Sequence, residues 1–453
     1  MTMFDDAIND LLANSISSLK LSGSHKKKEN IDSDLAARLA EALKVNYSLT
    51  SLTLNWTDIG KAGIKDIAYA LTINNSISIL NFAHNNISKV GAKDIAYALT
   101  INNFITSLNL GDNRISKVGA KDIAKVIKIN TTLTSLILYN NYMGDAGVIE
   151  IANVLKYNKS LIVLNLSGNN IGEIGATAIA DAIKFNNSLT SLIISGNSVD
   201  DVGTTAIADA LKYNKSLVAL NLSSNNVGDT GAIAIADALK LNHSLNKLDL
   251  GKNNIGNAGA IAIGDALQYN KSLTSLKLKK SNVSKDLLKS IKACIDRNID
   301  NKVVEASGLH EQALKLLDSG SPEDINEAAK LLKSAIKLVE QIKFGNPPLG
   351  NDLLTTYAAS NDHVLDLLQQ IDIDNKEIVE LKEALDTQWK VQEQKAKIVI
   401  QEQAMPEQKW NDIQESPINE DYKEPLVINL LSSPLQPPGY SPPSFNNTGG
   451  FSS

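Results

Sequence analysis

The chain has 453 residues, with 44 lysines and arginines against 50 aspartates and glutamates, and a formal net charge of −6. Its single cysteine excludes an internal disulfide framework and is typical of a reducing compartment. The acidic N-terminus and the lack of an apolar run of about 18 residues predict neither a signal peptide nor a membrane span, so we expect a cytoplasmic protein or one delivered into a host cytosol by another route.

The charge is divided unevenly along the chain. Residues 301–453 carry a net charge of −11, and residues 1–300 carry +5. An excess of this size over a large surface does not predict nucleic-acid binding, because no stripe of basic and aromatic residues accompanies it. We therefore expect a partner that is neither a nucleic acid nor a membrane.

The first 14 residues predict a short cap helix. Phe4, Ile8 and Leu11 fall on one helical face of MFDDAINDLL, which can cover the end of whatever follows.

A 28-residue repeat follows. In SLVALNLSSNN, Leu220 and Leu222 are two apart and share one face of a short strand. Ile235, Ala236 and Leu239 then recur at helical spacing. An earlier copy begins at Ser15 and is lengthened by the basic insertion HKKKEN. Further units begin without gaps at Ser48, Ser76, Phe104, Thr132, Ser160, Ser188, Ser216, Ser244 and Ser272.

The repeat resembles the leucine-rich repeat, L-x-x-L-x-L-x-x-N, in its ribonuclease-inhibitor-like subtype, and is most similar to the repeats of NOD-like receptors. The resemblance covers residues 15–299, about ten repeats. It implies an α/β fold, a right-handed horseshoe solenoid with a parallel sheet on the concave face and helices outside. It also implies a partner protein held by the concave face and the ascending loops.

Two asparagine series run through the repeats. We expect the first to form a ladder in which side-chain amides bond loop backbone groups. We expect the second, which falls where each helix ends, to adopt the left-handed conformation of a C-cap. The first series is Asn85, Asn113, Asn141, Asn169, Asn197, Asn225 and Asn253; the second is Asn46, Asn74, Asn102, Asn130, Asn158, Asn186, Asn214, Asn242, Asn270 and Asn298.

The remainder of the chain has no 28-residue period. Helical spacing predicts a small all-α region at 300–404, either a helical bundle or tetratricopeptide-like hairpins. Eight of the eleven prolines lie in 405–453, which predicts a disordered Pro/Ser-rich tail. Within this tail, Pro437, Pro438 and Tyr440 resemble the PPxY ligand of WW domains and suggest a WW-domain contact.

Catalytic patterns are missing from the sequence. Cys294, in ACID, resembles the nucleophile of bacterial leucine-rich-repeat ubiquitin ligases, but it occupies a position that six other repeats fill with alanine. We therefore interpret it as a packing residue. The five histidines show no metal spacing, and no phosphate-binding or nucleophile motif is present. We expect no enzyme activity, no cofactor and no metal.

Two functions remain. The first is a protein-binding scaffold, and the near-identical repeats favour a recent internal duplication such as a bacterial effector or symbiont protein could carry. The second is a GTPase activator, because the Ran GTPase-activating protein shares this repeat subtype; here the acidic residues are dispersed, and only Arg114 lies on an ascending loop. The lack of a catalytic constellation favours the scaffold.

The strand positions on the concave face are small or bland in most repeats, and the exceptions cluster. Large or charged residues surround the ladder asparagines of neighbouring early repeats, and we expect Tyr139 to lie on a strand beside them. Such residue types dominate binding energies at interfaces. The predicted partner-binding surface consists of Trp56, His84, Asp112, Arg114, Tyr139 and Tyr142.

Overall fold

The structure is a computed structural model that describes residues 3–23, 31–279 and 281–317, and residues 324, 327–328, 330–331, 333–335 and 337–338. The basic insertion, most of the expected helical region at 300–404, and the expected tail with Pro437, Pro438 and Tyr440 lie outside the described residues.

Helices and strands alternate along the described chain. The strands are β1 (Ser18–Lys20), β2 (Ser51–Thr53), β3 (Ile79–Asn81), β4 (Ser107–Asn109), β5 (Ser135–Ile137), β6 (Val163–Asn165), β7 (Ser191–Ile193), β8 (Ala219–Asn221), β9 (Lys247–Asp249) and β10 (Ser275–Lys277). The helices are α1 (Met3–Leu12), α2 (Ser33–Val45), α3 (Gly60–Leu71), α4 (Ser88–Ile101), α5 (Ser116–Ile129), α6 (Gly144–Leu155), α7 (Glu173–Phe185), α8 (Asp201–Tyr213), α9 (Asp229–Leu239), α10 (Asn257–Tyr269) and α11 (Lys285–Leu317).

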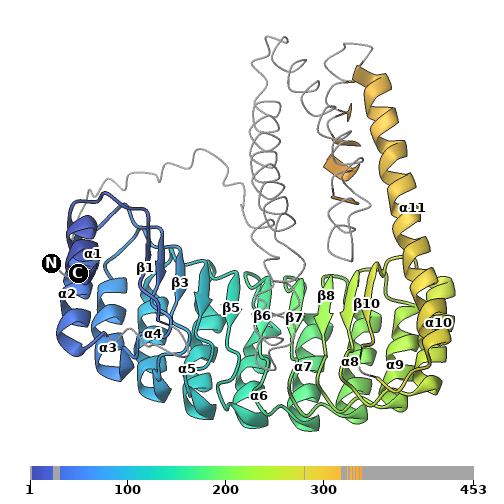
Figure 1. The fold of residues 1–453 in the computed structure, drawn as a ribbon, viewed down its shortest axis with the longest axis horizontal. Coiled ribbons are helices and arrows are strands. Elements are labelled where there is room, and N and C mark those ends of the chain that lie inside the picture. The colour runs from blue at the N-terminus through green and yellow to red at the C-terminus, as the bar shows by residue number, and fades with distance from the viewer. Residues whose placement is uncertain are drawn as a thin grey trace, which may run out of the picture. The chain divides into compact units, whose positions relative to one another are not determined.

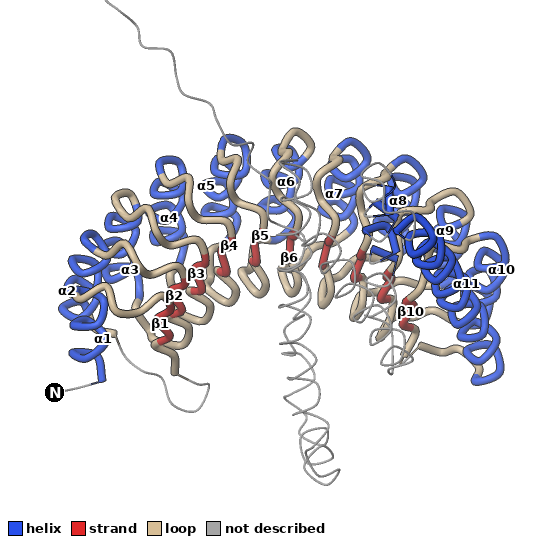
Figure 2. The backbone as a smooth tube through the Cα atoms, turned by 90° about the horizontal axis from the view of Figure 1, so that it is seen from above, coloured by secondary structure: helices blue, strands red, loops and turns tan. Residues whose placement is uncertain are grey.

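The strands form one ten-stranded parallel sheet in chain order, from β1 to β10. The register follows the sequence period, since Leu52 pairs with Leu80 and Leu80 with Leu108. Within the repeats, the strands line the inside of an arc and the helices its outside (Figures 1 and 2). The predicted α/β solenoid is confirmed.

The core lies between the sheet and the helices. The middle residue of most strands is buried, as at Leu52 and Leu108. Helices α3 to α10 turn a face of small and aliphatic residues, glycine among them, towards the core. At the N-terminal end, α1 packs against this core: Leu11 and Ile8 are buried, and Phe4 contacts the cluster. One repeat alone could not bury these faces, so neighbours stabilise each other.

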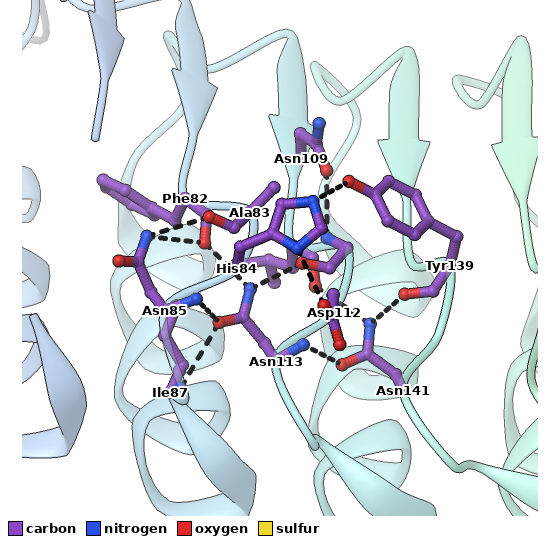
Figure 3. A network of polar contacts seen from close by, with 12 residues as sticks. Phe82, Ala83, His84, Asn85, Ile87, Asn109, Asp112, Asn113, Tyr139 and Asn141 are labelled. Carbon is purple, nitrogen blue, oxygen red and sulfur yellow. Dashed lines mark hydrogen bonds and ion pairs between the residues drawn. The ribbon is translucent and has the colours of Figure 1, made fainter. Parts of the chain in front are cut away.

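The first asparagine series forms the predicted ladder. Asn113 is fully buried, and its Oδ1 accepts the N–H of Asn85 at 2.9 Å. Its Nδ2 donates to the carbonyl oxygen of Phe82 at 2.8 Å. Figure 3 shows the ladder continuing to Asn141, which accepts the N–H of Asn113 at 3.0 Å. The ladder satisfies loop groups that no strand partner reaches.

The second asparagine series lies at helix ends, but the predicted left-handed conformation is wrong. Asn186 is extended, with φ −71° and ψ 131°, and Asn46 and Asn214 are similar. The side chain replaces the expected backbone cap: Asn186 Nδ2 donates to the carbonyl oxygens of Leu155 at 2.7 Å and Asn158 at 2.9 Å, both in the preceding repeat. We call this edge of the solenoid the helix-end edge.

The loops that lead from strand to helix have two forms. Before α3 to α6 they contain three residues with positive φ, as at Asp112, Arg114 and Ser116. Before α7, α9 and α10 a glycine is extended instead, and a side chain of the preceding repeat accepts its N–H; Asp145 Oδ1 accepts from Gly172 at 2.7 Å. The predicted surface lies on loops of the first form.

Helix α11 ends the solenoid and continues beyond it. Ile291, Ile295 and Ile299 are buried against the last repeat, so the expected boundary between residues 299 and 300 lies inside one helix. Cys294 is half-buried and packs against the same core. Further along α11, Ala306 packs with Ala335.

Candidate partner-binding surface

The residue before each ladder asparagine has a left-handed backbone. The φ angles are 59° at Trp56, 60° at His84 and 53° at Asp112. In two later repeats glycine fills the position, as Gly168 and Gly196, with φ of 64° and 63°, and Asn140, Ser224 and Lys252 fill it in the others with φ of 51–54°. Because bulky residues rarely adopt positive φ, the tryptophan and the histidine are unusual occupants.

His84 connects side chains from four consecutive repeats. Its ring stacks on Trp56 with centroids 3.8 Å apart and planes 11° from parallel. Its Nδ1 lies 2.7 Å from Asp112 Oδ2, and its Nε2 lies 3.0 Å from the Tyr139 hydroxyl (Figure 3). The His84 side chain is only 5% exposed, whereas that of Asp112 is 37% exposed. We call Trp56, His84, Asp112 and Tyr139 the edge cluster.

The Asp112 carboxylate determines which nitrogen of His84 carries a proton. A carboxylate can only accept, so His84 Nδ1 carries the proton that is shared with Asp112. When only Nδ1 carries a proton, the Tyr139 hydroxyl donates to Nε2; when both ring nitrogens carry one, Nε2 donates to that hydroxyl. The ring is thereby held from both sides in one orientation.

Tyr139 reaches His84 across an intervening repeat. It lies two residues after β5, in the turn, so the expectation that it lies on a strand is wrong. The equivalent residues of the two preceding repeats are small, Ala83 and Gly111. A Cβ at Gly111 would lie 2.2 Å from Tyr139 Cε1, so only glycine leaves room for this ring.

The other two predicted residues do not join the network. Arg114 and Tyr142 are exposed on the loops that follow β4 and β5, with φ of 56° and 54°. Within the described residues, neither contributes a hydrogen bond or ring contact to the edge cluster. The structure therefore brings together four of the six predicted residues and leaves two at their border.

Sequence reasoning missed two supporting residues. Gly111 provides space for Tyr139, and the Asn109 side chain accepts the Gly111 N–H at 2.9 Å, which holds the turn (Figure 3). The sequence signal was a glycine in a column where the next repeat has tyrosine. This signal becomes visible only when contacts between non-adjacent repeats, here those of His84 and Tyr139, are considered.

The opposite end of the sheet carries charges on its concave face. Burial lowers the pKa of Lys247 to about 8. Lys277 Nζ lies 3.4 Å from Asp249 Oδ2 on the neighbouring strand. Aromatic residues are missing from β9 and β10, so this end offers a different chemistry from the edge cluster.

The described residues contain neither a candidate metal site nor a membrane-spanning helix. No three or more histidine, cysteine, aspartate or glutamate side chains in this part of the chain are grouped so that they could hold a metal ion. Among the same residues, no helix combines the length and the hydropathy needed to cross a bilayer.

A strand, a turn and a helix repeated in register define a solenoid repeat protein. The family follows from the sequence of the units, eight of which match a leucine-rich-repeat family model. This chain is a leucine-rich-repeat protein; its assignment to the ribonuclease-inhibitor-like subtype stays a prediction. The matched residues are 45–68, 74–96, 102–124, 130–152, 157–180, 185–208, 213–236 and 241–264.

The similarity of the chain to two solved structures is low. The leucine-rich-repeat-containing protein LegL7 from Legionella pneumophila is 20% identical with a TM-score of 0.39, and the match covers 62% of this chain and 91% of that one. A chain of the yeast Rad7 and Elc1 complex is 14% identical with a TM-score of 0.41, covering 63% and 75%. Similarities this low do not extend to function. No curated protein matches the sequence.

Proposed function

We propose that this chain is a protein-binding scaffold whose partner contacts the edge cluster, with Arg114 and Tyr142 at the border of the contact. The observation that carries this proposal is the side-chain network centred on His84, which unites four repeats in one surface. Leucine-rich-repeat solenoids offer extended surfaces of this kind to partner proteins.

Folding alone does not explain the residues of the edge cluster. A left-handed backbone costs a non-glycine residue about 1–3 kcal/mol. Two later repeats have glycine at this position, Gly168 and Gly196, and three have a small or flexible polar residue, Asn140, Ser224 and Lys252. Among the described repeats, only Trp56 and His84 place an aromatic ring at this position. Residues held in such conformations cluster at functional sites.

The edge cluster also has the properties of an interface hot spot. Tryptophan, tyrosine and arginine are the residue types that contribute most to binding energies. The His84 ring is held by Trp56, Asp112 and Tyr139, so little side-chain entropy remains to be lost when a partner binds. The surface is therefore organised before the partner arrives.

The test begins with a partner captured by the full chain and then purified. The double change Arg114→Ala/Tyr139→Ala should weaken its binding by about 2 kcal/mol or more, about thirtyfold in Kd. The matched control, Lys93→Ala/Tyr97→Ala, removes the same chemistry from the exposed face of α4 and should change Kd less than about twofold. Equal affinities for the wild type and the Arg114/Tyr139 variant would refute the proposal.

The alternative, a GTPase activator resembling the Ran GTPase-activating protein, depends on Arg114. This residue is exposed on the loop between β4 and α5, where it could reach a bound nucleotide. We expect no stimulation of GTP hydrolysis when the chain is added to small GTPases. Stimulation that Arg114→Ala abolishes would establish the alternative instead.

A further inference from the structure

A row of exposed apolar side chains follows the helix-end edge. The residue before each helix-end asparagine is apolar and 44–75% exposed in nine consecutive repeats. Single exposed apolar residues are normal, but a continuous row of them indicates an interaction surface. This helix-end row consists of Val45, Ile73, Ile101, Ile129, Tyr157, Phe185, Tyr213, Leu241 and Tyr269.

The helix-end row is held rigidly. Each member precedes an asparagine that is bonded to the preceding repeat; Asn214 Nδ2 donates to the carbonyl oxygens of Ile183 at 2.7 Å and Asn186 at 3.1 Å. The row therefore presents one apolar group per helix. Packed helices lie about 8–10 Å apart, which sets the spacing of the row.

Lysines accompany the aromatic members of the row. Lys156 Nζ lies 4.4 Å from the centroid of the Phe185 ring, and Lys184 Nζ lies 4.8 Å from that of Tyr213. Lys159 and Lys215 lie in the turns just beyond the helices and are exposed. Among the described residues, none of these four lysines has a carboxylate within ion-pair distance, so the centre of the row is basic as well as apolar.

Stabilisation of the helices explains only some of the lysines near the helix-end row. Lysines in the last turn of a helix interact favourably with its dipole, which accounts for Lys184. The dipole explains neither the lysines in the turns, Lys159 and Lys215, nor the exposed rings beside them. Charge complementarity therefore points to an acidic partner with apolar groups of its own.

The course of α11 favours a protein over a bilayer. Asn298 occupies the helix-end asparagine position, since its Nδ2 donates to the carbonyl oxygen of Asn270 at 3.0 Å. Residues 299–317 continue the same helix past this edge by about 28 Å, at about 1.5 Å per residue (Figure 1). A flat membrane could not lie along the row while this helix projects beyond it.

We propose that the centre of the helix-end row, Tyr157, Phe185 and Tyr213, docks an acidic amphipathic helix of a partner protein. Apolar residues at every seventh position of a helix lie about 10.5 Å apart, close to the spacing of the row. Carboxylates on either side of that seam would meet Lys156, Lys159, Lys184 and Lys215. This surface is distinct from the edge cluster and does not depend on it.

The probe for this proposal is a fluorescein-labelled peptide of about 21 residues, with leucine at every seventh position and glutamate and alanine elsewhere. Its binding to the full chain is measured by fluorescence anisotropy. Tyr157→Gln/Phe185→Gln/Tyr213→Gln should weaken binding at least about tenfold, as should replacing each glutamate of the peptide with lysine. The three substituted residues are exposed, so the melting temperature of this variant should equal that of the wild type.

The matched control changes exposed apolar residues in the first turns of helices, at the opposite edge: Val118→Gln/Ile174→Gln/Val202→Gln. This variant should bind the peptide within about twofold of wild type. The proposal is overturned if the peptide does not bind, if the lysine peptide binds equally well, or if the aromatic variant binds like wild type. Sedimentation with phosphatidylserine vesicles that is lost in the aromatic variant would assign the row to a membrane and overturn it as well.

Discussion

Removing the ladder asparagine Asn113 should destabilise the solenoid far more than removing Asn86, a half-buried asparagine outside the ladder. In Asn113→Ala, the Asn85 and Ile87 N–H groups lose Asn113 Oδ1, which accepts them at 2.9 and 3.3 Å. The carbonyl oxygen of Phe82 keeps a second donor, Asn85 Nδ2 at 3.0 Å. The change therefore leaves two buried donors without their acceptor.

The magnitude follows from these two donors. An unsatisfied buried donor costs about 1–3 kcal/mol, so we expect a loss of about 2–6 kcal/mol in the free energy of unfolding. The control is Asn86→Ala. Asn86 is half-buried, and its Nδ2 donates to Asp58 Oδ1 at 2.9 Å. Its φ of 53° suits asparagine better than alanine, so the change should cost about 1 kcal/mol.

Two assays measure the effect. Urea unfolding followed by circular dichroism compares both variants with the wild type, and hydrogen exchange reports the amides of Asn85 and Ile87 directly. We expect faster exchange at these two amides in Asn113→Ala only. If Asn113→Ala and Asn86→Ala unfolded at the same urea concentration, the ladder would not hold the repeats together.

Three further changes test separate parts of the structure. Gly111→Ala should displace the Tyr139 ring and reduce partner affinity about tenfold in a titration, because the added Cβ would overlap that ring; unchanged affinity would contradict the proposed contact. Asp145→Ala should lower stability by about 1–2 kcal/mol in urea unfolding, since its carboxylate accepts the N–H groups at the start of α7; a neutral result would show that water replaces it. Cys294→Ala should shift stability by less than about 1 kcal/mol, and a larger loss of any measured activity would reveal a role for the thiol.

Much of the fold could be predicted from the sequence because each repeat restates the same local pattern. Leu220 and Leu222 indicate a strand, the following spacing indicates a helix, and 28-residue periodicity stacks them in register. The ladder role of Asn113 followed from the same logic. A repeated residue in a turn must satisfy backbone groups that the strands leave open.

The conformation of the helix-end asparagines and the capping of α7 could not be predicted, because both depend on contacts between repeats. Asn186 was expected to cap its own helix with a left-handed backbone, but its side chain bonds the preceding repeat instead. The capping of α7 by Asp145 also crosses repeats. Single-repeat reasoning does not consider such bonds, because their partners lie 27 to 31 residues away.

The candidate surface was predictable as a column of unusual residues but not as a network. The column placed Trp56, His84 and Asp112 side by side. It did not show that His84 would bond Tyr139 across a whole repeat, since this contact depends on the space left by Gly111. Arg114 is predicted from its residue type alone, and in the structure it lies outside the edge cluster, at its border.

Hydroxyl-radical footprinting of the chain, alone and bound to its captured partner, tests the central claim most directly. Oxidation of Trp56, Tyr139 and Tyr142 should fall several-fold in the complex, while exposed Tyr47 and Tyr97, which lie on other surfaces, should be oxidised equally in both states. Protection confined to residues outside the edge cluster and its border, with Trp56 and Tyr139 unchanged, would contradict the account.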